Sequence, residues 1–270
     1  MSADPLDRLD DAGRAALDEI VSMLAADRRA PSSVRDAEEA WRVHVADSLS
    51  ALEIEPLAEA RRIADIGAGA GFPGLALAAA MPKAEVDLIE SVERKCEFAR
   101  RAAQIVGRDR GGVVCDRAET WAASTPPEGG RESYDAVTAR AVGRLSTLAE
   151  LASPMLHEDG VLVAWKGRRD PDEEAELARA AERLAMEPLE VRWVGPYAGS
   201  RNRHLHLMRK VGATPEGLPR RPGMAKKRPF GRRESPSGGG RCDPPHGDVV
   251  EGPWGKRGWA TSAKSPRPPL

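Results

Sequence analysis

Cysteine and aromatic residues are scarce in this sequence, and long apolar runs are absent. Only three cysteines occur among 270 residues, far apart and without a CxxC pair. This scarcity argues against a disulfide scaffold and a zinc site, and it suits the reducing cytoplasm. No apolar run approaches the ~20 residues needed to cross a bilayer, and the N-terminus lacks a secretory h-region. We therefore expect a cytoplasmic protein with no metal and no membrane contact.

The near-neutral net charge of -1 hides an asymmetry between the two ends of the chain. From residue 201 onward there are 16 Lys and Arg against 5 Asp and Glu, which gives +11. Subtracting these from the totals of 41 and 42 leaves 25 against 37 for residues 1–200, or -12. A basic C-terminal part on an acidic body indicates contact with a polyanion, although a solvated tail without a specific partner has the same composition.

Apolar spacing predicts two N-terminal helices, followed by alternating strands and helices. The helices are expected at 5–26, 36–53, 73–81, 93–107, 145–157 and 171–186. The strands are expected at 62–67, 85–90, 112–115, 134–140, 160–167, 189–194 and 203–211. This alternation is typical of an α/β sandwich with a mostly parallel sheet.

The last two strands are too close in sequence for a crossover helix, so they should form a terminal antiparallel hairpin. A seven-stranded sheet that ends this way is the arrangement of class I S-adenosylmethionine (SAM) methyltransferases, a Rossmann-like sandwich. We expect an N-terminal helical segment at 1–60, a SAM-binding core at 61–212 and a basic extended arm at 213–231. Residues 232–270 are rich in Pro, Gly and basic residues and are expected to be a disordered tail.

The stretch "RRIADIGAGAGFPGLAL" at 61–77 is typical of a nucleotide-like cofactor loop. Glycines let the backbone turn sharply and approach a ligand, and the N–H groups of the next helix face it. A P-loop is excluded because no Gly-Lys-Ser/Thr ending follows. The loop matches the dinucleotide pattern GxGxxG from Gly69, and from Asp65 through Gly67 and Gly69 it also matches the methyltransferase pattern DxGxGxG. The glycines alone leave both alternatives open.

The ends of the next two strands favour SAM. Glu90 ends the second strand, where a carboxylate accepts hydrogen bonds from both ribose hydroxyls in dehydrogenases and methyltransferases alike. The third strand leads into Asp116, Ala118 and Glu119, where a methyltransferase usually contacts the adenine. Together with the terminal hairpin, these positions favour a methyltransferase over an NAD-dependent oxidoreductase. An oxidoreductase is further disfavoured because the sequence contains no evident catalytic Tyr-x-x-x-Lys pair.

Several phrases of the sequence occur in an order that resembles one enzyme family. They are "WRVHVADSL" (41–49), "DIGAGAGFPG" (65–74), "IESVERKCEFAR" (89–100), "RAE" (117–119), "YDAVTARAV" (134–142), "LVAWKG" (162–167) and "PRRPGMAKKRPF" (219–230). Over about residues 34–230 the chain resembles the bacterial 16S ribosomal RNA guanine-N7 methyltransferases, also called glucose-inhibited division protein B. Just before the matching region, where the family usually has the phrase Asn-Leu-Thr, this sequence reads "APSS".

The resemblance implies SAM-dependent methylation of a guanine in the 530 loop of 16S rRNA. Carried over by motif, the cofactor contacts are Gly67, Phe72, Ala118, Glu119 and Arg140. Guanine N7 carries a lone pair and no proton, so we expect no general base; proximity and alignment should supply most of the catalysis.

Candidate RNA contacts complete the prediction. Arg140 is the possible catalytic residue, at the mouth where cofactor and target meet, and Lys166 ends the fifth strand near an RNA phosphate or the guanine edge. The arm supplies the other expected RNA contacts: Arg220, Arg221, Lys226, Lys227 and Arg228. We expect a monomer acting on 16S rRNA or the small ribosomal subunit, and the alternative to an enzyme is a non-catalytic RNA-binding protein.

Overall fold

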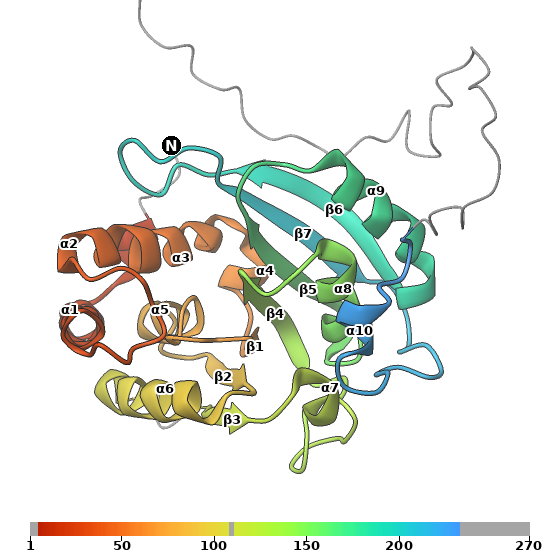
Figure 1. The fold of residues 1–270 in the computed structure, drawn as a ribbon, viewed down its shortest axis with the longest axis horizontal. Coiled ribbons are helices and arrows are strands. Elements are labelled where there is room, and N and C mark those ends of the chain that lie inside the picture. The colour runs from red at the N-terminus through yellow and green to blue at the C-terminus, as the bar shows by residue number, and fades with distance from the viewer. Residues whose placement is uncertain (1–4, 108–110, 233–270) are drawn as a thin grey trace, which may run out of the picture.

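One seven-stranded sheet forms the centre of the protein, with strand order β3-β2-β1-β4-β5-β7-β6 (Figure 1). The structure is a computed structural model that describes residues 5–107 and 111–232. The strands are β1 (Arg62–Ile66), β2 (Glu85–Glu90), β3 (Val113–Cys115), β4 (Tyr134–Arg140), β5 (Leu156–Lys166), β6 (Met186–Trp193) and β7 (His204–Lys210). β1 to β5 run parallel, and β7 pairs antiparallel with both β5 and β6. The predicted α/β architecture with a terminal hairpin is therefore confirmed.

Helices cover both faces of the sheet (Figure 1). Among the described residues, the α-helices are α1 (Asp11–Ala26), α2 (Ala37–Ala40), α3 (Asp47–Leu49), α4 (Glu55–Ala58), α5 (Gly74–Ala80), α6 (Glu93–Val106), α7 (Ala118–Trp121), α8 (Leu145–Ala152), α9 (Pro171–Ala180) and α10 (Met224–Lys227). Further helical turns are η1 (Pro5–Arg8), the π-helical η2 (Trp41–Ala46), η3 (Ser50–Glu53) and η4 (Glu182–Leu184). Within the described ranges, no helix is both long and apolar enough to cross a membrane.

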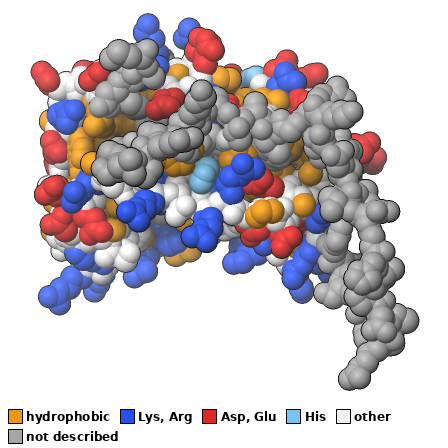
Figure 2. Space-filling model, turned by 90° about the horizontal axis from the view of Figure 1, so that it is seen from above, with side chains coloured by type: hydrophobic (Ala, Val, Ile, Leu, Met, Phe, Trp, Pro, Cys, Tyr) orange, Lys and Arg blue, Asp and Glu red, His pale blue; other side chains and the backbone are white. Residues whose placement is uncertain are grey.

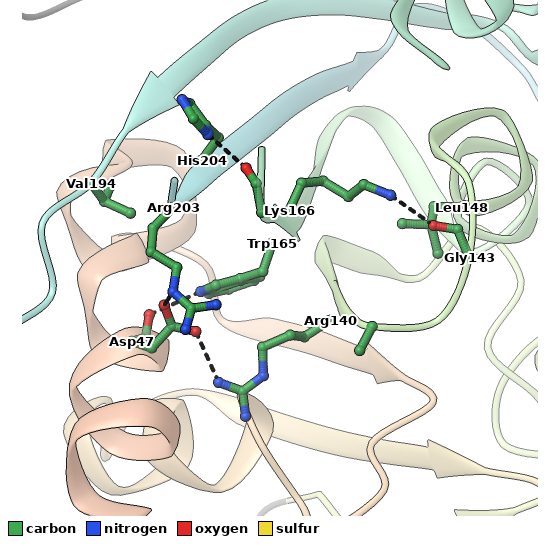
Figure 3. A pocket seen from close by; sticks show the side chains of 11 residues that line it. Asp47, Arg140, Gly143, Leu148, Trp165, Lys166, Val194, Arg203 and His204 are labelled. Carbon is green, nitrogen blue, oxygen red and sulfur yellow. Dashed lines mark hydrogen bonds and ion pairs between the residues drawn. The ribbon is translucent and has the colours of Figure 1, made fainter. Parts of the chain in front are cut away.

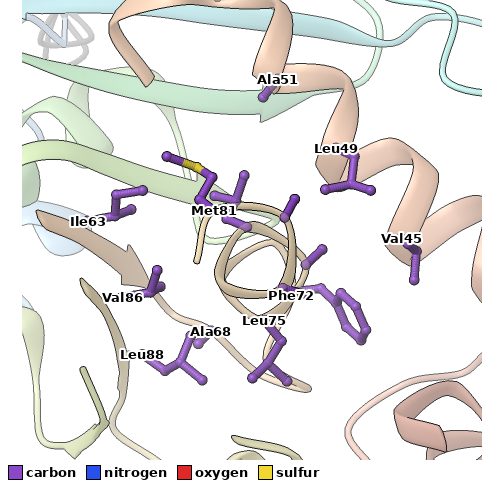
Figure 4. Close-up of a cluster of buried hydrophobic side chains, with 14 of the residues drawn as sticks. Val45, Leu49, Ala51, Ile63, Ala68, Phe72, Leu75, Met81, Val86 and Leu88 are labelled. Atoms are coloured by element: carbon purple, nitrogen blue, oxygen red, sulfur yellow. The ribbon is translucent and has the colours of Figure 1, made fainter. Parts of the chain in front are cut away.

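Successive side chains of the central strands belong alternately to two separate hydrophobic clusters, one on each face of the sheet. Ile63 of β1 packs with α1 and α5, as does Val86 of β2, whereas the neighbouring Ala64 belongs to the cluster under α8 and α9. This is the two-residue period of a strand buried on both sides. Figure 4 shows the first cluster, in which Phe72 and Leu75 lie near Val45.

The N-terminal helices are shorter than their apolar pattern predicts. The helix expected at 5–26 begins at Asp11, because the Asp10 carboxylate accepts a hydrogen bond from the Gly13 N–H and caps it there. The helix expected at 36–53 begins as predicted after Asp36 but is divided into α2, η2, α3 and η3. Its π-helical part, η2, contains His44, and π-helical turns often occur at functional sites.

The arm at 213–231 differs from the extended segment that its prolines predict. It contains one helical turn, α10, and it folds back onto α8 and α9. The Thr147 hydroxyl donates to the Ala225 carbonyl, and Arg179 Nε donates to the Gly231 carbonyl. The predicted tail lies outside the described residues beyond Arg232.

Candidate functional site

The glycine loop that follows β1 approaches the neighbouring chain too closely for a side chain. Gly67 has φ +67°, and a Cβ placed on it would lie 2.6 Å from Val142 Cγ2. Glycine tolerates this left-handed backbone and supplies the missing volume. The loop therefore passes directly beneath the segment that follows β4, at the point where the strand order reverses between β1 and β4. Ligands of open α/β sheets bind at such a switch point.

Asp65 holds the loop from below. Its carboxylate is fully buried; one oxygen accepts from the Gly74 N–H at 2.9 Å, and the other accepts from the Thr138 hydroxyl at 2.9 Å. Burial raises the pKa of Asp65 to about 7, although both hydrogen bonds act in the opposite direction. Asp65 thus joins β1, α5 and β4.

Glu90 organises the other side of the loop. One carboxylate oxygen accepts from the N–H groups of Ser91 and Val92, both at 2.9 Å. The second oxygen accepts from the Gly69 N–H at 3.1 Å and lies 3.8 Å from Lys95 Nζ. A carboxylate offers about four acceptor positions, so this arrangement leaves capacity for a ligand hydroxyl.

A cavity of about 450 Å³ opens above Glu90, at the carboxyl ends of β1 and β2. Its apolar walls include Ile66, Ile89, Ala118, Val142 and Leu151, and its acidic members are Glu90, Asp116 and Glu119. The volume falls in the usual range of small-ligand pockets. An apolar slot with carboxylates at its rim is suited to a nucleoside.

The C-terminal arm closes this cavity from above. Gly223, Ala225, Lys226 and Lys227 all line it, and the Gly223 N–H donates to Glu119 Oε1 at 2.7 Å. Glu119 is 8% exposed, so this hydrogen bond satisfies a nearly buried carboxylate. The arm is therefore a wall of the nucleoside-sized cavity.

A second cavity, of about 220 Å³, lies on the far side of the segment 140–143 (Figure 3). Val142 lines the first cavity, whereas Arg140, Ala141 and Gly143 line the second. Ala141 has φ +59°, a left-handed conformation that costs a non-glycine residue energy and is found mostly where the surrounding structure enforces it. Four consecutive residues thus form the wall between two cavities.

Arg140 connects β4 to the π-helical turn η2. Its NH1 donates to the Val43 carbonyl at 3.2 Å and to Asp47 Oδ2 at 3.1 Å, and its NH2 lies 3.3 Å from His44 Nδ1. A guanidinium has only donors, so His44 Nδ1 accepts and its Nε2–H donates to the Ser32 hydroxyl at 3.0 Å. Burial, with a contribution from Arg140, lowers the pKa of His44 to about 4, so this imidazole is neutral at pH 7.

Two further cations, Arg203 and Lys166, line the second cavity. Arg203 Nε lies 3.8 Å from Asp47 Oδ1, and Trp165 Nε1 donates to the Asp47 carbonyl at 2.9 Å. Lys166 Nζ donates to the Gly143 carbonyl at 3.0 Å and to Glu173 Oε1 at 2.7 Å. Figure 3 shows Arg140, Arg203 and Asp47 pointing toward one another from β4, the segment before β7 and α3.

Comparison with known proteins agrees with this geometry. The family model described as rRNA small subunit methyltransferase G matches residues 23–205. The ribosomal RNA small subunit methyltransferase G of Pelotomaculum thermopropionicum is 39% identical over 189 residues, which are 69% of this chain and 77% of that protein. The protein of that name from Rubrobacter xylanophilus is 38% identical over 219 residues, 79% of this chain and 82% of its own.

The chain belongs to the rRNA small subunit methyltransferase G family. The resemblance drawn from the sequence motifs is thereby confirmed. Among solved structures, the mitomycin 7-O-methyltransferase MmcR is similar in fold, with a TM-score of 0.50 and 15% identity over 71% of this chain and 60% of that one. The predicted class of fold is confirmed as well.

SAM is the cofactor of this family, and the residues of the first cavity fit it. Glu90 has acceptor capacity left for a ribose hydroxyl, and the apolar walls near Ala118 suit an adenine. The absence of a side chain at Gly67 keeps the floor open. These three positions, with Glu119, would hold the adenosine part.

The predicted cofactor residues divide into two groups in space. Gly67, Glu90, Ala118 and Glu119 line the first cavity together. The other four predicted cofactor residues are described by the structure but do not line this cavity: Asp65, Gly69, Phe72 and Arg140. Phe72 is buried and its ring stacks on His44 with centroids 5.3 Å apart. Direct cofactor contacts by these four therefore stay predictions.

Sequence reasoning missed Arg203 and the role of the arm as a cavity wall. The antiparallel register places His204 opposite Lys166, so a residue just before β7 must lie beside the end of β5. That pairing was a usable signal for Arg203. No local pattern indicated that Gly223 meets Glu119, because the contact spans 104 residues.

The expectation of reduced cysteines is corrected in one place. The structure joins Cys96, in the first turn of α6, to Cys115, the last residue of β3. The two lie 19 residues apart in sequence, but α6 returns the chain so that β2 and β3 pair side by side. Cys242 lies outside the described residues.

Proposed function

We propose that this protein transfers the methyl group of SAM to N7 of a guanine in the 530 loop of 16S rRNA. The observation that carries the proposal is the pair of neighbouring cavities that both use the segment 140–143 as a wall. One fits a nucleoside cofactor, and the other is small, basic and next to it. Family membership supports small-subunit rRNA as the substrate.

The chemistry requires little of the protein beyond placement. Bound SAM supplies an electrophilic methyl group, and guanine N7 has a lone pair and no proton to remove. No general base is required, so the residues at the mouth act by orienting the acceptor and excluding water. Arg140 is suited to this role because four protein groups fix its guanidinium: Val43, His44, Asp47 and Ser48.

The basic cavity is proposed to receive the acceptor nucleotide. An enzyme that modifies a base takes it from single-stranded RNA or extracts it from its stack. Arg203 and Lys166 lie at the entrance, where their side chains are 37% and 21% exposed. Seen from above, Lys and Arg side chains gather along the lower margin of the body, on both sides of a hollow (Figure 2).

The arm is proposed to contribute further RNA contacts through its exposed cations Arg221, Lys226, Lys227 and Arg228. Arg220, the fifth cation of the arm, is instead bound to Glu150. We also propose that the protein acts as a monomer in the cytoplasm, on rRNA or the assembled small subunit.

Transfer of labelled methyl from SAM to unmodified small-subunit RNA, naked and assembled, tests the proposal. We expect one labelled guanine in the 530 loop. Demonstrated SAM binding without incorporation into either substrate, or label at another atom, would show that the acceptor is different.

A further inference from the structure

A second basic surface lies away from the arm, between α1 and α6. A groove of about 720 Å³ is bordered there by five arginines and only two acidic residues, Asp27 and Glu97. The arginines come from two distant parts of the sequence: Arg28, Arg29, Arg94, Arg100 and Arg101. We call this surface the arginine groove. It stands out because residues 1–200, which contain it, carry a formal charge of -12.

Three of the five arginines are available to a ligand. Arg28, Arg29 and Arg94 are exposed, and their side chains form no ion pair with any described residue. Arg100 is bound to Glu93 at 2.9 Å, and Arg101 to Asp27 at 2.8 Å. Of the two acidic residues of the groove, Asp27 is thus neutralised by Arg101.

The turn that carries Arg28 and Arg29 is held in place. The Arg35 guanidinium donates to the carbonyls of Leu24, Asp27 and Arg28, at 3.3, 2.8 and 3.3 Å. The Asp27 carboxylate accepts from the Arg29 N–H at 2.8 Å. The end of α1 is therefore capped, and the two arginines project from an ordered backbone, which lowers the entropy lost when they bind.

The groove is linked to the reaction site through two segments of the chain. Arg94 lies in the first turn of α6, three residues after Ser91, which lines the cofactor cavity. The turn after α1 reaches the other cavity through Ser32, whose hydroxyl bonds to His44, which in turn contacts Arg140. The two ends of the groove are thus attached to segments that line or support both cavities.

We propose that the arginine groove binds phosphate groups of the rRNA backbone while the target guanine occupies the site. Guanidinium groups are suited to phosphate, since their N–H donors match two phosphate oxygens at once. This inference rests on the proposed function, because it assumes an RNA substrate. The inference places the RNA backbone on the α1–α6 side of the two cavities, opposite the C-terminal arm.

A matched pair of charge reversals tests the proposal. The groove variant is R28E/R29E/R94E, and the control is R8E/R61E/K83E. Arg8, Arg61 and Lys83 are exposed and lie around the amino-terminal ends of β1 and β2, at the opposite edge of the sheet. Both variants change the net charge equally, so a difference between them reports position rather than charge.

We expect the groove variant to bind unmodified 16S rRNA about 30-fold more weakly than wild type at 0.15 M salt, from roughly threefold per phosphate contact. The slope of log affinity against log salt should fall by about 2 to 3. The control should change affinity less than threefold, and both should bind SAM like wild type. Equal weakening in the two variants, or none in the groove variant, would overturn the proposal.

Folding and the proposed function are separated within the same experiment. Should the glutamate variant fail to unfold cooperatively, R28A/R29A/R94A supplies the milder change and must still lower the salt slope relative to R8A/R61A/K83A. Wild-type protein that binds rRNA without methylating it contradicts the proposed function alone. Wild-type methylation with unaltered RNA binding in the groove variants contradicts the groove alone.

Discussion

The C-terminal arm gathers its cations in the sequence, whereas the arginine groove gathers them in space. Five arm cations fall within nine residues, from Arg220 to Arg228, yet Arg220 is bound to Glu150 through two hydrogen bonds of 2.5 Å. Its guanidinium also lies 4.0 Å from the Phe230 ring centroid. The groove draws on residues 65 positions apart, from Arg29 to Arg94, and three of its cations form no ion pair with any described residue. A basic run in sequence therefore overstates the charge that a ligand meets by one cation in the arm, and it does not reveal the groove at all.

The largest expected effect comes from Arg220→Ala, which separates anchoring from RNA binding in the arm. Glu150 is 2% exposed and would be left as a buried, unpaired carboxylate. We expect the free energy of unfolding to fall by about 3 to 5 kcal/mol in denaturant titrations. SAM affinity should fall too, because the undocked arm no longer covers the cavity.

Arg221→Ala is the matched control, since Arg221 is exposed and neighbours Arg220. Its free energy of unfolding should stay within about 0.5 kcal/mol of wild type. Equal stability of the two variants, with a loss of RNA affinity only, would show that Arg220 is an RNA contact rather than an anchor.

Glu90→Ala tests the cofactor side without touching either basic region. It removes the acceptor for the N–H groups of Gly69, Ser91 and Val92. Hydrogen bonds to charged groups contribute about 1.5 to 3 kcal/mol each, so we expect SAM affinity to fall about 100-fold in a calorimetric titration. RNA affinity should not change.

Two further variants serve as comparisons for the SAM affinity of Glu90→Ala. Glu90→Gln keeps one acceptor oxygen and should lose less SAM affinity than the alanine variant. Glu93→Ala removes an exposed carboxylate from the same region and should bind SAM normally. Normal SAM binding by Glu90→Ala would mean that the first cavity is not the cofactor site.

His44 links the groove side to the acceptor cavity and makes stability depend on pH. Its pKa is about 4 in the folded protein and 6.5 when unfolded, so its contribution is complete above pH 6.5 and is lost as the pH falls toward 4. We expect wild type to lose about 1 to 2 kcal/mol of unfolding free energy between pH 7.5 and 5.5 from this group. His44→Gln should lack this part of the loss.

Denaturant titrations of both proteins at the two pH values provide the measurement. The pKa of His206 is also lowered to about 4, and it titrates alike in both proteins, so the difference between the curves isolates His44. Parallel pH dependence in wild type and variant would contradict the assignment of a neutral His44.

The smallest expected effect is that of Lys226→Glu/Lys227→Glu in the arm. Two lost phosphate contacts should weaken RNA binding about tenfold at 0.15 M salt. SAM affinity should change less than threefold, because both lysines are exposed at the rim of the cavity. A larger effect on SAM than on RNA would assign these lysines to the cofactor instead.

The positions of the strands along the chain and the chemistry of the glycine loop were predictable because they depend on local patterns. Apolar alternation identified each strand of the sheet, and the glycines at 67–71 together with Glu90 marked its ligand-binding edge. Parallel strands place their carboxyl ends at one edge, so Arg140 and Lys166 were expected near the mouth, and both line the second cavity.

The rest of the site depends on contacts between residues far apart in the chain. The two hydrogen bonds from Arg220 to Glu150 span 70 residues, and the pair Arg140–Asp47 spans 93. Neither contact produces a periodic pattern in the sequence from which it could be predicted. The arm was misjudged as extended because proline restricts the backbone without showing what the segment packs against. The groove was missed for the same reason, since α1 and α6 meet only in the folded protein.

The central claim is methyl transfer to guanine N7, and replacing that atom tests it most directly. Small-subunit RNA would carry 7-deazaguanosine, with carbon in place of N7, at the guanine that accepts the label in unmodified RNA. The account predicts unchanged RNA affinity and no incorporation at that nucleotide. Incorporation into the substituted base at the wild-type rate would contradict it and assign the methyl group to another atom.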